Sequence, residues 1–107
     1  MSLYRFKSRE TGDLVMLKPH GQRILEILGK DTETGIIQPP EMLAAIDTLR
    51  AAVIAQEAEQ KRLVEEAQAK GEVPPEFESV GLRMRCAPFI EMLERCAQAK
   101  VDIVWGV

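Results

Sequence analysis

The sequence predicts an α+β fold in a single domain over residues 1–107. Three observations support this prediction: an alternating hairpin pattern near the N-terminus, a long run with helical apolar spacing, and a short apolar run at the C-terminus. We expect a small, mainly antiparallel three-stranded sheet, formed by the N-terminal hairpin and the C-terminal strand. Helices, including a long helical hairpin, should pack on one face of this sheet.

The hairpin is expected over residues 3–8 and 13–18. Residues 3–8 alternate with the period of a strand that has one apolar face, and Gly12 can supply a positive φ in the turn. Residues 14–17 are apolar on both faces. We therefore expect this second strand to lie in the centre of its sheet or beneath a partner chain.

Two helices are expected in the middle of the chain. A short one should run from Gly21 to Leu28 and end at Gly29, and Ile36 and Ile37 should then anchor the chain. The long one should run from about Pro40 to Lys70. Its buried stripe has a four-three-four spacing: Met42, Ile46, Leu49 and Val53. Beyond Gln56 large aliphatic residues are few, so this half should project into water or lie along a partner.

The last helix is expected to begin at an N-cap, Ser79, and to end near Lys100. Pro88 interrupts its apolar pattern, and it either kinks one helix or starts a second one. The final strand, residues 101–105, should pair with the N-terminal hairpin. Its alternation places Trp105 on the face that the helices cover.

The composition argues against several classes of protein. A net charge of −3 and a pI near 5.2 do not suit a nucleic-acid binder. No stretch reaches the ~20 apolar residues of a membrane span, and the N-terminus lacks a signal sequence. Cys86 and Cys96 would lie ~15 Å apart on one helix, too far for a disulfide. We expect them to be reduced and buried, and the protein to be cytoplasmic.

The best candidate site is the predicted strand-to-helix turn at Lys18, His20, Gly21 and Arg23. A helix N-terminus attracts anions, and these residues add cationic donors and a close approach to the backbone. The turn is more often an ordinary solvated helix start with a surface histidine, because every helix has an N-terminus and most bind only water. No metal, cofactor or catalytic residue is expected, because one histidine and two distant cysteines match neither a zinc spacing nor an activated nucleophile. One of Arg83 and Arg85 is expected to pair with Glu91 or Glu94.

Short motifs along the chain resemble the domain of unknown function family eighteen-forty, which comprises small uncharacterised bacterial proteins. The matching segments are Tyr4-Arg5-Phe6-Lys7-Ser8, Gly12-Asp13, Val15-Met16-Leu17, Ile27-Leu28-Gly29-Lys30, Gly35-Ile36-Ile37, Leu82-Arg83-Met84-Arg85, Pro88, Glu91-Met92-Leu93 and Ile103-Val104-Trp105-Gly106. The resemblance is loosest from Gln56 to Glu78. It implies a stand-alone domain and assigns no activity to any residue.

The sequence favours a non-enzymatic interaction or regulatory module that acts as a homo-oligomer with an unknown protein partner. The alternative is a small-molecule anion binder, or a weak enzyme, that uses the Lys18–Arg23 turn. Neither a nucleic-acid nor a membrane partner is expected.

Overall fold

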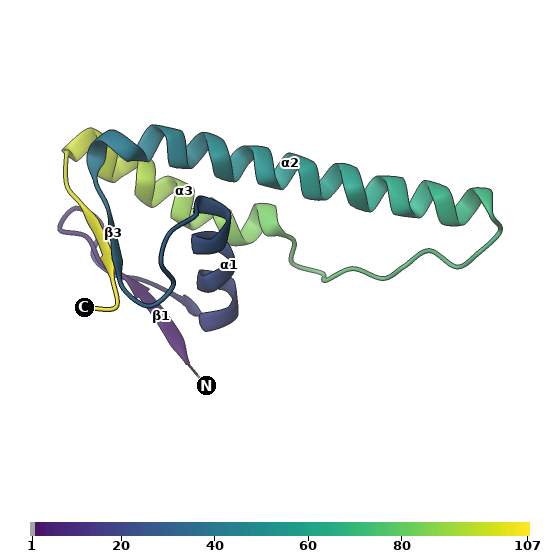
Figure 1. Ribbon diagram of the computed structural model, residues 1–107, viewed down its shortest axis with the longest axis horizontal. Helices are drawn as coiled ribbons and strands as arrows, with labels where there is room; N and C mark the ends of the chain where they lie inside the picture. Colours follow the sequence, from purple (N-terminus) through teal and green to yellow (C-terminus); the bar gives the residue numbers. More distant parts are fainter. Residues whose placement is uncertain (1) are drawn as a thin grey trace.

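The computed structural model describes residues 2–107, and Figure 1 shows an α+β arrangement, as expected. The elements follow one another as β1 (Leu3–Phe6), β2 (Leu14–Leu17), α1 (Lys18–Leu28), β3 (Gly35–Ile37), α2 (Pro39–Ala69), α3 (Leu82–Ala99) and β4 (Ile103–Trp105). The turn at Gly12 has the expected positive φ, and Gly29 ends α1 in the left-handed conformation.

The sheet differs from the single three-stranded one that was expected. β1 pairs with β2, and β4 pairs with β3, so the structure has two antiparallel two-stranded sheets. An isolated β-bridge joins the two sheets, through two backbone hydrogen bonds between Lys7 and Val104. β3 was expected only to anchor the chain. It pairs with β4 because Gly35 lies beneath the Trp105 indole, where a Cβ would come within 2.4 Å of the ring.

The strands therefore lie in the spatial order β3-β4-β1-β2, and their side chains alternate between two faces. The inner face carries buried residues of the core, among them Phe6, Ile37, Ile103 and Trp105. The outer face carries exposed apolar residues, which are Leu3, Val15, Leu17 and Ile36. Of the two positions expected for β2, the central one was wrong, since within residues 2–107 no strand pairs with its other edge. Cover by a partner chain stays a prediction.

Helices α2 and α3 form the expected long helical hairpin (Figure 1). α3 is continuous through Pro88, because Pro88 and Met84 both lie on its exposed side, where water can reach the carbonyl that loses its donor. Its N-cap is Gly81 rather than Ser79. The Leu82 N–H donates to Gln56 Oε1 on α2 at 3.1 Å, so a neighbouring helix supplies the cap.

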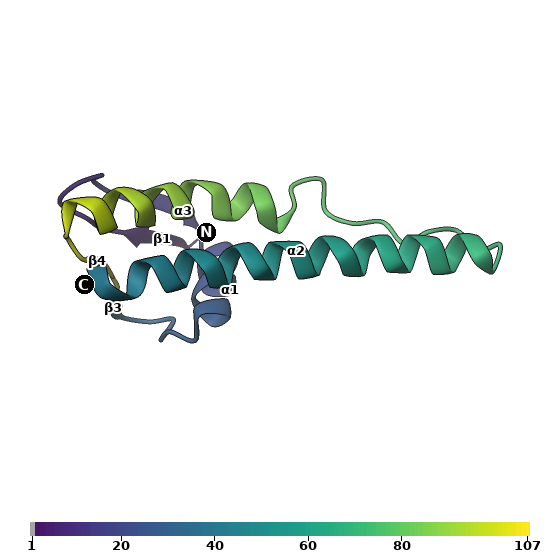
Figure 2. The same cartoon turned by 90° about the horizontal axis from the view of Figure 1, so that it is seen from above.

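The distal half of α2 extends beyond the core. The chain then returns alongside it as an irregular segment, residues 71–81, which we call the strap (Figures 1 and 2). Together the strap and residues 56–70 form the arm. The expectation that this half of α2 projects into water or lies along a partner did not include the strap, which runs beside it (Figures 1 and 2). The strap itself stays exposed from Gly71 to Val80, whereas Ala67 on α2 is buried.

The core gathers where the sheets meet the helices. Phe6 makes edge-to-face contacts with Phe89 and Trp105, with ring centroids 4.7 and 5.9 Å apart. Cys86 and Cys96 are buried and free, as expected. No helix within residues 2–107 has the length and apolarity to cross a membrane.

Candidate functional site

The helix of the predicted anion site begins earlier than expected. α1 starts at Lys18, directly after β2, with Leu17 as its N-cap. The Lys18 N–H donates to the carbonyl of Ser2 at 3.1 Å, and Pro19 has no N–H to offer. His20 is thus the first residue of the helix whose N–H is free to meet a ligand.

Gly21 has a packing role in this structure. It is buried, and a Cβ at this position would come within 2.1 Å of the Tyr4 ring. The absence of a side chain therefore lets α1 pack closely on β1. Lys18 is exposed and does not line a cavity with the other predicted residues.

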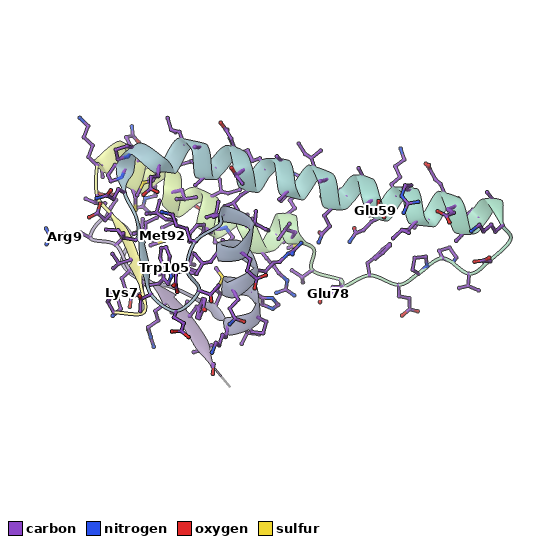
Figure 3. All side chains as sticks on the ribbon, viewed as in Figure 1. Lys7, Arg9, Glu59, Glu78, Met92 and Trp105 are labelled. Carbon is purple, nitrogen blue, oxygen red and sulfur yellow. The ribbon has the colours of Figure 1, made fainter. Side chains whose placement is uncertain are left out.

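His20 and Arg23 do lie together, in a cavity of about 510 Å³ between the start of α1, the middle of α2 and the strap. Arg85 of α3 and Gln60 of α2 also line it, and Phe77 adds an aromatic ring. Arg85 pairs with Glu78 of the strap at 3.3 Å, and Figure 3 marks Glu78 there. The cavity combines cationic, amide and apolar groups with two carboxylates, Glu76 and Glu78, so an anion would have to bind at the end where His20 and Arg23 lie.

The sequence did not indicate that Arg85, Gln60 and Phe77 belong to this cavity. They come from separate elements that only the fold of the strap brings together. The expected pairing of one of Arg83 and Arg85 with Glu91 or Glu94 was wrong. Arg83 forms a bidentate pair with Glu57, and Arg85 pairs with Glu78 of the strap.

Both cysteines are free and buried. Burial raises the pKa of the Cys86 thiol, and the nearby charge of Arg23 offsets this only in part. Cys96 Sγ lies 2.9 Å from Ser8 Oγ. Within residues 2–107, no three His, Cys, Asp or Glu side chains are grouped so as to hold a metal ion.

The loop after α1 is held by intrachain contacts. Lys30 Nζ donates to Glu41 Oε1 at 2.6 Å, and Asp31 Oδ1 accepts the N–H of Glu33 at 2.7 Å. These contacts fix the loop against the start of α2.

One comparison with known proteins gives a result. A family model described as Domain of unknown function (DUF1840) matches residues 2–105. The chain belongs to this family. No curated protein and no solved structure matches the chain. The DUF1840 match covers every helix and strand described above, so the fold is that of the family domain, and its function has to be argued from its surfaces.

Proposed function

We propose that this protein is a non-enzymatic interaction or regulatory module of the cytoplasm that acts as a homo-oligomer. The observation that carries the proposal is the outer face of the sheet, where apolar side chains gather without a cover. Leu3 is 52% exposed, Val15 41% and Leu17 39%. Leu3 lies opposite Leu17 in the β1–β2 ladder, so they form one contiguous patch with Val15. Contiguous apolar patches on a surface mark interaction sites.

A second copy of the chain suits this patch for two reasons. The face also carries Arg5 and Asp13, which form an exposed ion pair at 3.7 Å. In a two-fold interface each Arg5 can meet the partner's Asp13, so the patch is complementary to itself. The free edge of β2 adds backbone groups that a second β2 strand can pair with.

The non-enzymatic part of the proposal rests on the thiols. Both cysteines are buried, and burial disfavours the thiolate of Cys86 that a nucleophile requires.

Light scattering after size-exclusion chromatography tests self-association at tens of micromolar. We expect a mass above that of the 12.0 kDa chain for the wild type, and a monomeric mass for Val15→Lys and Leu17→Lys. The control is Leu43→Lys on α2, which places the same charge at a more exposed leucine, 68%. It should not change the mass. A monomeric wild type would overturn the proposal, and so would dissociation by the control alone.

A second candidate is the binding of a small anion near the Lys18–Arg23 turn. It is supported by the convergence of His20, Arg23 and Arg85 on one cavity. If it is correct, inorganic phosphate should shift the ring protons of His20 in the NMR spectrum at constant ionic strength. Arg23→Gln should abolish that shift.

A further inference from the structure

A different cavity lies at the end of the molecule opposite the arm. It has a volume of about 600 Å³ and opens where β1 and β4 diverge beyond the Lys7–Val104 bridge. Its polar lining comes from Lys7, Ser8, Arg9, Lys100 and Asp102, and Val101 and Val104 add apolar surface. Figure 3 shows Lys7 and Arg9 at this end and Glu59 on the arm. Three cations thus face one carboxylate, in a chain whose net charge is −3.

Within residues 2–107, two of the three cations that line this cavity have no carboxylate partner. The nearby carboxylates are already used, since Glu10 pairs with Arg95 and Asp13 with Arg5. Within residues 2–107 no carboxylate pairs with Arg9 or Lys100. Lys7 Nζ donates one hydrogen bond at 2.7 Å to a carboxylate oxygen of Val107, the last residue of the printed sequence, and its ammonium group has two further N–H donors.

Lys100 stands at a position that glycine usually takes. It ends α3 with φ 58° and ψ 45°. Among residues 2–107, no other residue except glycine has a positive φ. α1 ends at Gly29 in the same conformation. A left-handed conformation strains a residue with a Cβ, and helices commonly end there with glycine. The lysine thus brings its charge to the cavity at a cost in backbone strain.

We propose that this cavity binds a dianionic phosphate group of a small molecule, such as a phosphate monoester. Arg9 and Lys100, with which no carboxylate pairs within residues 2–107, supply two positive charges that match those of a phosphate dianion. Arg9 can hold two phosphate oxygens with its guanidinium, and Lys7 and Lys100 act as point charges. The apolar residues Val101 and Val104 offer a surface for the carbon part. This site is independent of the proposed self-association and of the cavity at His20.

The experiment is a titration of the full chain with inorganic phosphate, followed through backbone amide shifts by NMR at constant ionic strength. We expect saturable shifts centred on the amides of Arg9, Lys100 and Asp102. Lys100→Gly should weaken the affinity about ten-fold, the usual cost of losing a hydrogen bond to a charged group. It should also keep or raise the melting temperature, because glycine removes the strain. Loss of binding then cannot be explained by unfolding.

Arg9→Gln tests the same site from the other strand and should also weaken phosphate binding about ten-fold. Lys61→Gln on the arm removes the same charge far from the cavity and should leave the affinity unchanged. Three results would overturn the proposal: no saturable shifts, shifts centred on His20 instead, or equal weakening by Lys61→Gln. The last would show that phosphate responds to net charge alone.

Discussion

Trp105 shows how a single side chain ties separate elements together. Its indole is 2% exposed, lies over Gly35 and meets the ring of Phe6. Its Nε1–H donates to the carbonyl of Asp31 at 2.9 Å. The side chain therefore joins β4 to β1, to β3 and to the loop after α1. Its expected position on the face covered by helices is consistent with this burial.

Trp105→Ala should destabilise the fold strongly. Removing a buried aromatic side chain costs about 3–5 kcal/mol, out of the ~5–15 kcal/mol that stabilises a domain. We expect the melting temperature, followed by circular dichroism, to fall by many degrees, or soluble expression to fail. Trp105→Phe keeps an aromatic ring and loses the hydrogen bond to Asp31. Its melting temperature should lie between those of the wild type and of Trp105→Ala. A Trp105→Ala variant that melts within about two degrees of the wild type would contradict this role.

At the scale of elements, the start of α2 is held by Glu41. Its Oε2 accepts the backbone N–H of Gln38 at 2.8 Å, and its Oε1 accepts a hydrogen bond from Lys30 at 2.6 Å. These hydrogen bonds lower the pKa of the Glu41 carboxyl below its ordinary value. The bond from the Gln38 N–H has the larger effect, and the bond from Lys30 has the smaller one. The carboxylate also interacts favourably with the dipole of the helix it caps.

This contact should make the stability of the protein depend on pH. The folded pKa of Glu41 lies below the unfolded one, so its contribution is present above the unfolded value of about 4.3. It is lost as the pH falls through the folded value. Glu41→Gln should cost about 0.5–1 kcal/mol at pH 7, because the side chain is partly exposed.

Urea unfolding of both proteins from pH 7 to pH 2.5 measures this difference. It should shrink as the pH falls below about 4. A difference that stays constant over this range would show that the charge of Glu41 does not stabilise the start of α2.

The elements differ in how well the sequence predicts them, because some depend on local sequence patterns and others on contacts between distant segments. The hairpin, α2 and the apolar stripe of α3 follow from local patterns, and the structure confirms them. β3 was missed because a strand of three residues has no periodicity, and its pairing depends on a glycine beneath a distant tryptophan. The cavity beside His20 was predicted only in part, because Arg85 and Phe77 reach it through the strap. Unpaired cations near Lys100 likewise have no local sequence signature.

At the scale of the whole molecule, the arm determines the shape. The principal extents are 52 × 30 × 20 Å, and the radius of gyration is 16.0 Å. A compact chain of this length would have about 13 Å. The excess arises because the distal half of α2 and the strap extend beyond the core (Figure 2).

The arm should open locally without unfolding of the core. The strap is exposed and carries few backbone hydrogen bonds, so its amides should exchange with solvent almost unprotected. Amides near Leu49, which is fully buried on α2, should exchange only with global unfolding. Hydrogen exchange followed by mass spectrometry of peptides checks this gradient. Equal protection of residues 76–80 and of the helix around Leu49 would rule out an independently mobile arm.

The bridge between Lys7 and Val104 joins two segments that are nearly a whole chain apart in sequence. Closing so long a loop is entropically costly and slows the formation of the contact. The only tryptophan, Trp105, is the neighbour of Val104 and enters the core as this contact forms. The change of its fluorescence during refolding therefore reports the rate at which the two ends of the chain come into contact. Far-ultraviolet circular dichroism instead follows helix formation. The delay between the two signals therefore measures how much later β4 pairs with β1 than the helices form.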